Sequence, residues 1–259
     1  MKSNNEYLRV RKLDHHFGED GDRLPVLRKI DLSVKRGRFV SLIGPSGCGK
    51  STFFDLLAGL ISPTSGHILL EGREITGQRG HIAYMPQRDL LFPWRTMLEN
   101  VVLGAEVEGR SITEAKRRAR ELLPLFGLEG FENARPGELS GGMRQRAALL
   151  RTVLIGKDLM ALDEPFGSLD ALTRGRMQEW LIDVWRELQP TILFVTHDIE
   201  EALLLSDRVH VMSVRPGTII DEVEVSKSRP RSRADPELVE LKNQLVENLM
   251  QREGDLSTV

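Results

Sequence analysis

A single stretch of nine residues has the composition and spacing of a phosphate-binding loop. Residues 44 to 52 read GPSGCGKST and match the pattern G-x-x-x-x-G-K-[ST], whose glycines let successive backbone N–H groups point at phosphate oxygens. In such a loop Lys50 reaches the β- and γ-phosphates, the Ser51 hydroxyl binds Mg²⁺, and we expect Thr52 to hydrogen-bond nearby phosphate. A chance match in a chain of this length is on the order of one per cent. The predicted cofactor-binding residues of this loop are Gly44, Pro45, Ser46, Gly47, Cys48, Gly49, Lys50, Ser51 and Thr52.

Two later apolar segments end in residues that could assist phosphate chemistry. LMALDEP carries Asp163 and Glu164, and TILFVTHD carries His197 directly after its apolar run. The carboxyl ends of parallel strands meet at one edge of a sheet, so we expect these side chains beside the loop. Asp163 would then hold the metal through its water shell, Glu164 would polarise water as a base, and His197 would position the γ-phosphate and the attacking water. Taken alone, an acidic pair is more often a helix cap, and a lone histidine is more often a surface or packed residue.

The stretch LSGGMRQR, residues 139 to 146, places two glycines where a helix begins. Glycine costs a helix interior roughly 1 kcal/mol relative to alanine, so Gly141 and Gly142 mark backbone that something approaches closely. A helix N-terminus carries unpaired N–H groups and about half a positive charge, which suit an anion. The alternative is an ordinary N-cap, Ser140, followed by a tight turn.

The hydrophobic pattern predicts the elements that must position these residues. Residues 7 to 34 read as an antiparallel hairpin interrupted by the polar stretch 18 to 23, and residues 39 to 44 form a compact strand. Residues 96 to 155 are predicted to be mostly helical, and EAKRRARE (114 to 121) is predicted to be a solvated helix face. Strands at 159 to 163 and 191 to 196 alternate with a helix at 171 to 188, the pattern of a parallel sheet wrapped by helices. The polar segment KSRPRSRADPE, interpreted as a solvated linker, then leads to a helix from about residue 237 to 251.

Composition excludes several classes of protein. The chain has 259 residues with 36 Lys and Arg against 38 Asp and Glu, so its formal net charge is −2 and no general basic field argues for nucleic acid. No apolar run is long enough for a membrane span, and the N-terminal residues have no apolar signal core. Its one cysteine, Cys48, cannot form an internal disulfide, and we interpret it as a small packed residue.

Taken together, these motifs resemble the ATP-binding cassette (ABC) family, and the resemblance covers roughly residues 7 to 225. The matching elements, all in the family's order, are GPSGCGKST, Gln87 in YMPQ, LSGGMRQR, LMALDEP, Asp170 in SLD and His197. The resemblance implies an α/β fold: a P-loop NTPase cassette with a RecA-like parallel-sheet core, an antiparallel β subdomain and a helical signature subdomain. It also implies an adenine-stacking aromatic, for which Phe17 or His16 is the best match.

The resemblance further implies an ATPase that works with ATP and Mg²⁺. Gln87 would contact both the γ-phosphate and the metal, and Asp170 would lie near the nucleotide. Two copies would pair head to tail, so that Ser140, Gly141 and Gly142 meet the γ-phosphate held by the other chain's Lys50. The expected domains are an ATPase domain at 1–225, with a helical subdomain at about 90–158, and a linker and C-terminal helix at 226–259.

Within the family, RDLLFPWRTMLENVVLGAE and VTHDIEEALLLSDRV look like the importer cassettes of the nitrate, sulfonate, taurine and bicarbonate group, with relatives that serve thiamine precursors. The implied partners are integral-membrane permease subunits and, indirectly, a solute-binding protein, with the chain peripheral at the cytoplasmic face of the inner membrane and no nucleic acid. The alternative is a soluble ABC ATPase acting on nucleic acid or ribosomes. A small-molecule kinase or GTPase fits less well because LSGGMRQR is complete, and a non-hydrolysing ATP sensor fits less well because Glu164 and His197 are present.

Overall fold

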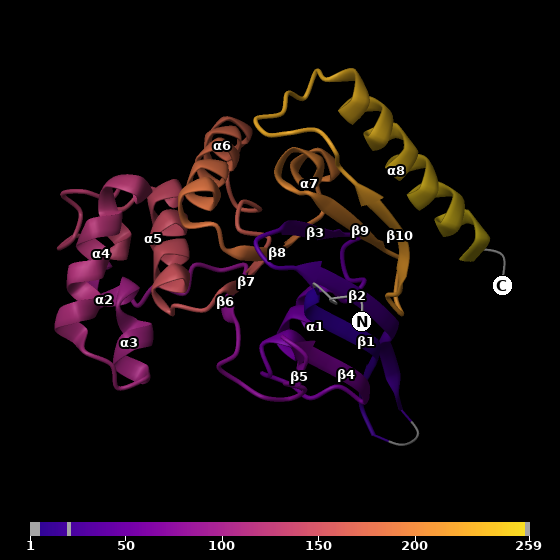
Figure 1. Ribbon diagram of the computed structural model, residues 1–259, viewed down its shortest axis with the longest axis horizontal. Helices are drawn as coiled ribbons and strands as arrows, with labels where there is room; N and C mark the ends of the chain where they lie inside the picture. Colours follow the sequence, from indigo (N-terminus) through magenta and orange to yellow (C-terminus); the bar gives the residue numbers. More distant parts are fainter. Residues whose placement is uncertain (1–5, 20–21, 257–259) are drawn as a thin grey trace. The chain divides into compact units, whose positions relative to one another are not determined.

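The chain forms two compact units. The computed structural model describes residues 6–19 and 22–256, with side chains as far as residue 248. Met1–Ile82 and Pro190–Val259 make the first unit, and Ala83–Gln189 make the second. Figure 1 gives the labels of their helices and strands.

The first unit begins with an antiparallel sheet of four strands in the order β2-β1-β4-β5. Its strands β1 and β2 pair from Glu6 opposite Lys35 to Phe17 opposite Leu24, which confirms the predicted hairpin. Residues 20 and 21 of the intervening turn lie outside the described residues. The strands are β1 (Glu6–Phe17), β2 (Leu24–Lys35), β4 (Ser65–Leu70) and β5 (Arg73–Glu74).

The same unit contains parallel strands that lead to the phosphate-binding loop. Strand β3 lies between β8 and β9 and runs parallel to both, while β10 is antiparallel to β9. Every residue of β3 and β8 is buried, as expected for parallel strands covered on both faces. The bounds are β3 (Phe39–Ile43), β8 (Thr191–Thr196), β9 (Arg208–Met212) and β10 (Ile219–Glu224).

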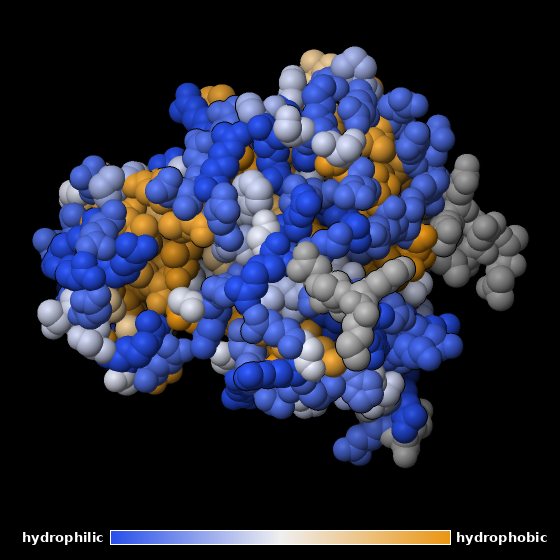
Figure 2. All heavy atoms as spheres, in the orientation of Figure 1, coloured by the Kyte–Doolittle hydropathy of each residue, from blue (hydrophilic) through white to orange (hydrophobic). Residues whose placement is uncertain are grey.

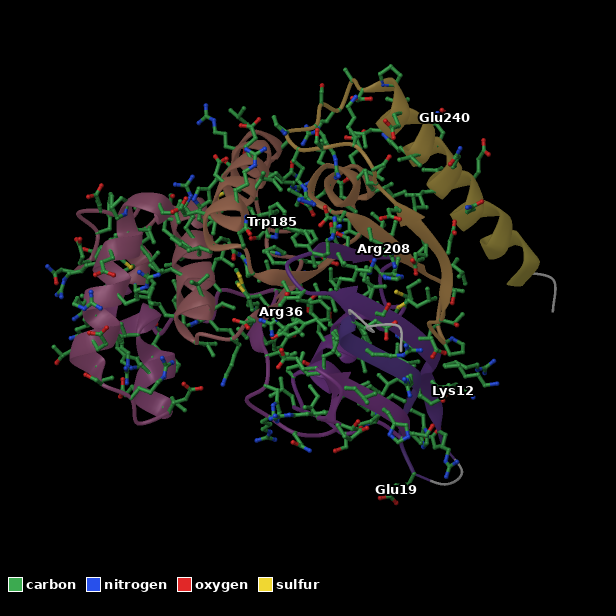
Figure 3. All side chains as sticks on the ribbon, viewed as in Figure 1. Lys12, Glu19, Arg36, Trp185, Arg208 and Glu240 are labelled. Carbon is green, nitrogen blue, oxygen red and sulfur yellow. The ribbon has the colours of Figure 1, made fainter. Side chains whose placement is uncertain are left out.

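Three helices complete the first unit: α1 (Lys50–Leu57), α7 (Ile199–Leu205) and α8 (Pro236–Leu256). Helix α1 starts directly at the phosphate-binding loop. Helices α7 and α8 share one apolar cluster with the strands, made of Ala202 and Leu203 from α7, Val209 and Val211 from β9, and Leu238 and Leu245 from α8. The other side of α8 is exposed to solvent, and Glu240, which is labelled in Figure 3, is one of its exposed residues.

The second unit is mainly helical. Its strands β6 (Ala83–Met85) and β7 (Leu159–Asp163) are parallel. Helix α5 packs against α2, α3 and α4, and on α4 Arg117 pairs with Glu114 and Glu121 on an exposed face, which confirms the predicted solvated face. The helices are α2 (Met97–Val101), α3 (Leu103–Val107), α4 (Ile112–Phe126), the 3₁₀ turn η1 (Pro136–Glu138), α5 (Gly141–Leu154) and α6 (Ala171–Leu188).

Two features near the C-terminus differ from the expectation. Helix α8 extends to Leu256 rather than ending near residue 251. The interpretation of KSRPRSR as a solvated connection is wrong for two of its arginines: the Arg229 side chain is 6% exposed, and Arg231 donates to carbonyls of the core. Among the described residues, no helix is both long enough and apolar enough to span a membrane.

Candidate nucleotide-binding site

The loop between β3 and α1 has the backbone of a phosphate cradle. Gly47 and Gly49 adopt φ angles of 78° and 111°, in the left-handed region that favours glycine. At Gly49 a side chain would also collide with the strand below, because an added Cβ would lie 2.8 Å from Leu27 Cδ2. The chain's own folding therefore requires glycine here, and the loop ends at the N-terminus of α1, where backbone N–H groups are available to an anion.

The polar side chains of the loop lie at the start of α1. Lys50 is almost completely buried, and its ammonium donates to the carbonyls of Gly44 at 2.7 Å and Pro45 at 2.9 Å. Ser51 is exposed and Thr52 is half-buried. Lys50 is thus held inside the loop by backbone acceptors, a position from which phosphate oxygens could replace those carbonyls.

Cys48 is packed, as the sequence analysis expected. Its side chain is buried, with Sγ 3.9 Å from the Lys50 ammonium, and burial raises the pKa of the thiol. The loop also has a contact that sequence reasoning missed. Arg215, from the turn between β9 and β10, donates from Nη2 to the Gly47 carbonyl at 3.0 Å. No motif in SVRPGT signals this, because the contact depends on how the β9–β10 turn folds.

His197 follows the strand next to the loop. Strands β3 and β8 are in parallel register, with Ile43 opposite Thr196, so Gly44 and His197 each come one residue after a paired position. Asp198 then caps α7 by accepting from the Glu201 N–H at 3.1 Å. The strand register therefore brings His197 to the edge at which the loop begins, and its side chain is exposed there.

In the second unit, β6 and β7 bring Gln87 and the acidic pair together. Met85 lies opposite Leu162, and just beyond these residues Gln87 Nε2 donates to Glu164 Oε2 at 3.4 Å. Asp163 is 3% exposed at the end of β7. Glu164 has a φ of 42°, a left-handed conformation that costs a non-glycine residue of order 1 kcal/mol or more and is concentrated at functional sites.

The LSGGMRQR segment forms the predicted helix start. Ser140 is the N-cap of α5, and its hydroxyl accepts from the Met143 N–H at 3.2 Å. Neither Gly141 nor Gly142 has a positive φ, and an added Cβ would meet its nearest neighbour at 3.6 Å and 3.4 Å respectively, which is ordinary contact. Within one chain, nothing at this helix start requires glycine.

Asp170 and Phe17 are the two remaining residues predicted to contact the nucleotide. Asp170 is the N-cap of α6 and accepts from the N–H groups of Leu172 at 3.1 Å and Thr173 at 3.0 Å; these hydrogen bonds, the Thr173 one foremost, lower its pKa. Phe17 ends β1 with 45% of its surface exposed and meets His15 edge to face. The alternative aromatic, His16, is hydrogen-bonded to Thr64: the Nδ1 of His16 lies 3.1 Å from the Thr64 hydroxyl. Phe17 is thus an exposed ring available for stacking.

Two of the residues predicted to bind Mg²⁺ carry oxygen donors. Ser51 supplies a hydroxyl and Asp163 a carboxylate, both oxygen donors of the kind that Mg²⁺ prefers. Among the residues that the structure describes, no group of three or more His, Cys, Asp or Glu side chains is placed to hold a metal ion. Hydroxyl and carboxylate oxygens are the kind of ligand that Mg²⁺ combines with water and substrate phosphates, so each residue is chemically suited to the predicted role.

Comparison with known proteins agrees with this geometry. The family model described as ABC transporter matches residues 27–167. An uncharacterized ABC transporter ATP-binding protein of Methanocaldococcus jannaschii is 41% identical over 92% of this chain and 90% of its own length. The aliphatic sulfonates import ATP-binding protein SsuB of Bacillus thuringiensis is 37% identical over 92% of this chain and 94% of its own, and the nitrate import ATP-binding protein NrtD of Synechocystis is 42% identical over 85% and 83%.

Solved structures give the same result. A dimeric bacterial ABC transporter cassette superposes with a TM-score of 0.74 at 29% identity, covering 85% of this chain and all of the other. A second dimer, described as a post-hydrolysis state bound to ADP and phosphate, has a TM-score of 0.73. The predicted cassette fold, with its parallel strands, antiparallel sheet and helical region, is confirmed, and so is nucleotide binding. The chain therefore belongs to the ABC transporter family, as one of its ATP-hydrolysing subunits.

Proposed function

We propose that this chain hydrolyses ATP with Mg²⁺ through the residues at its strand ends and uses that reaction to power import of a small solute. The observation that carries the ATPase role is the strained Glu164, which follows a buried aspartate and is hydrogen-bonded to Gln87. Glu164 accepts a proton from water as the water oxygen attacks the γ-phosphorus and the bond to the β-phosphate oxygen breaks. Gln87 and His197 orient that water, and Lys50 binds the β- and γ-phosphates.

The metal and the adenine are assigned from the same residues. Bound Mg²⁺ supplies charge neutralisation for the phosphates. Ser51, Asp163 and Gln87 would hold it, Ser51 through its hydroxyl and Asp163 through the water shell of the ion. Phe17 stacks on the adenine, because it is the exposed aromatic at the end of β1. Asp170 acts near the nucleotide while it caps α6.

The active assembly is a head-to-tail pair of identical chains. The support is steric: Gly141 and Gly142 have ordinary helical backbone and room for a Cβ, so their lack of side chains serves something that approaches from outside the chain. A γ-phosphate held by the Lys50 of a second copy fits the anion preference of a helix N-terminus. The dimeric cassettes among the structural relatives support this assembly.

The partner in the membrane is a permease, and the chain lies at the cytoplasmic face. The segment LLFPWR supports a docking role because Trp94 is 67% exposed and stacks on Phe92 with ring centroids 5.0 Å apart. Exposed aromatic residues are enriched at the energetic centres of interfaces. Figure 2 shows apolar surface over the helices α2 to α5, within the same unit.

The solute class follows from the relatives. Their names specify import of nitrate and of aliphatic sulfonates, and on that basis we assign a small oxyanion as the solute class. A thiamine precursor is the other class that the sequence resemblance implies. A solute-binding protein and the permease select the solute, since this chain holds only the nucleotide chemistry.

The first test uses a trapped dimer. Glu164→Gln should retain ATP binding and lower turnover by about 10² to 10⁴-fold, the usual contribution of a positioned base. In that variant ATP should produce a dimer by size-exclusion chromatography with light scattering, and Ser140→Arg should abolish it by filling the anion site. Near-normal turnover would remove Glu164 from its role, and a dimer that survives Ser140→Arg would remove the shared site.

The alternative function, an ABC ATPase acting on nucleic acid or ribosomes, has lost its main candidate surface. Such a function would use the basic segment KSRPRSR, but there Arg229 pairs with Asp207 and Arg231 donates to backbone carbonyls. Nucleic-acid binding needs basic side chains that are free to meet phosphates.

A further inference from the structure

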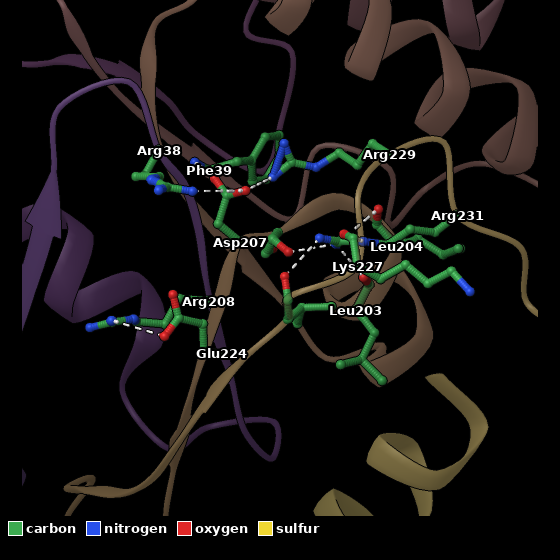
Figure 4. A network of polar contacts seen from close by, with 12 residues as sticks. Arg38, Phe39, Leu203, Leu204, Asp207, Arg208, Glu224, Lys227, Arg229 and Arg231 are labelled. Atoms are coloured by element: carbon green, nitrogen blue, oxygen red, sulfur yellow. Dashed lines mark hydrogen bonds and ion pairs between the residues drawn. The ribbon is translucent and has the colours of Figure 1, made fainter. Parts of the chain in front are cut away.

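The segment after β10 fastens the helix that follows His197. Arg231 donates from Nη1 to the carbonyl of Leu203, in the last turn of α7, at 2.7 Å and to that of the C-cap Ser206 at 2.6 Å. The same guanidinium donates to the Val225 carbonyl at 3.1 Å and the Lys227 carbonyl at 2.7 Å. One side chain therefore joins the carboxyl end of α7 to the chain that leaves β10, and Figure 4 shows this arrangement.

Arg231 supplies the positive charge that the last turn of α7 lacks in its own sequence. Helix α7 has seven residues and no basic residue in its last turn, so its terminal carbonyls have no local cation. Such a short helix has few internal hydrogen bonds, and contacts at its ends and along its buried side fix its orientation. Burial lowers the pKa of Arg231 to about 10, so the guanidinium stays charged at neutral pH.

A neighbouring arginine anchors the same segment to β3. Arg229 pairs with Asp207, whose Oδ2 accepts from the Phe39 N–H at 2.9 Å and whose own N–H donates to the Phe39 carbonyl at 2.7 Å. Phe39 is the first residue of β3, the strand that leads to the phosphate-binding loop. The segment that holds α7 is therefore tied to the same strand that positions the nucleotide.

The amino end of α7 connects directly to His197. The Asp198 N–H donates to Thr196 Oγ1 at 3.1 Å, and the Asp198 carboxylate caps the helix. His197 lies between the end of β8 and this cap, so its direction depends on the angle at which α7 leaves the strand. Near this end, Lys242 of α8 and Arg233 of the preceding segment pair with Glu200, and ion pairs this exposed contribute little, while the apolar contacts of α8 with α7 lie along the buried side of α7.

We propose that Arg231 is a positioning residue for His197: by capping the carboxyl end of α7, it fixes the short helix whose amino end sets the direction of the imidazole. The inference rests on the proposed role of His197 in hydrolysis. Arg231 does not touch the nucleotide in this account, and its effect on catalysis passes through α7.

The test is a double-mutant cycle in the full chain. Arg231→Gln should lower kcat for ATP about 10-fold, since a misplacement of the order of 1 Å is costly, while KM changes less than about twofold because the loop is untouched. In a His197→Ala background the same change should cause no further loss of kcat. A merely structural role would instead lower activity by the same factor in both backgrounds.

Two control variants distinguish the loss of a positive charge from the loss of the Arg231 contacts to α7. Arg38→Gln removes an exposed guanidinium 3.6 Å from the same Asp207 and should leave kcat unchanged. Arg231→Lys keeps the charge but offers fewer donors, so an intermediate kcat is expected; this variant also carries the cycle if Arg231→Gln does not fold.

Each outcome distinguishes the inference from the function on which it rests. Full activity in His197→Ala overturns the role of His197 and the inference with it. Loss of activity in His197→Ala together with additive losses, or with no loss at all in Arg231→Gln, overturns the inference alone and leaves the proposed ATPase intact.

Discussion

Replacing Gly142 with alanine separates what folding needs from what catalysis needs. The residue lies in the first turn of α5, where an added Cβ would be 3.4 Å from Thr173 Cγ2 and 3.9 Å from Met177 Sδ. Both are ordinary contact distances. Alanine is favoured over glycine in a helix by about 1 kcal/mol, and a first-turn position realises part of that, so we expect the isolated chain to be about 0.5 kcal/mol more stable.

The same substitution should lower the rate of ATP hydrolysis, although it raises stability. If the γ-phosphate of a second copy approaches the backbone N–H of Gly142, a methyl group there holds it away. A displacement of about 1 Å costs up to about 100-fold in rate, so we expect kcat to fall between about 10-fold and 100-fold. The matched control is Gly175→Ala in α6, where an added Cβ would meet nothing within 4 Å; it should raise stability similarly and leave turnover unchanged.

Two measurements on each variant are sufficient. Urea unfolding of the nucleotide-free chain gives the free energy of unfolding, and steady-state hydrolysis at several protein concentrations gives kcat. A Gly142→Ala protein that is at least as stable as the parent and also hydrolyses ATP at the parental rate would refute the shared site. A decrease of more than about 1 kcal/mol in the free energy of unfolding would instead show that α5 has no room for a side chain at position 142.

Three further outcomes follow from exposure and burial. Phe17→Ala should raise KM for ATP about 10-fold in steady-state assays, whereas His16→Ala should change it little. Trp94→Ala should leave unfolding and basal hydrolysis unchanged and weaken co-purification with the permease; normal co-purification and transport would exclude the docking role. Burial, with the Arg208 charge beside it, lowers the pKa of His210 from 6.5 to about 4. Because only the unfolded ring binds a proton between those values, stability should fall as pH drops from about 6.5 to 4, by up to about 3 kcal/mol, and urea titrations of His210→Gln should lose that slope.

The positions of the catalytic candidates were predictable because each follows a continuous apolar strand. Sequence alone indicates that Asp163 and His197 end such strands, and the structure confirms the strand ends. What the pattern could not indicate is backbone conformation. The left-handed φ of Glu164 has no signal in LDEP, since glutamate is not a residue that favours that region. The roles assigned to these side chains remain predictions that the variants above test.

For two arginines of the segment after β10, the interpretation as a solvated linker is wrong for a definite reason. Its residues KSRPRSR have the composition of a hydrated linker, and composition records charge but not which carbonyls lie nearby. Arg231 is half-buried, and it donates to carbonyls at the end of α7, from residues that precede it by more than 20 positions. A contact between segments so far apart in the chain depends on the fold, so local pattern does not reveal it.

Two pairs of glycines give another case in which the sequence does not indicate the backbone conformation but the structure does. Gly47 and Gly49 in the loop look equivalent in sequence to Gly141 and Gly142 in the first turn of α5, since each pair stands at the start of a helix. The loop pair is required by this chain alone: both have positive φ, and at Gly49 a Cβ would collide with β2. The second pair has ordinary helical backbone and room for a methyl group. Glycine there costs helix stability and relieves no strain within the chain, which is what we expect if a group from outside approaches this backbone, and a helix N-terminus favours an anion. The difference between the two pairs is therefore a physical argument for a nucleotide site that two copies close together.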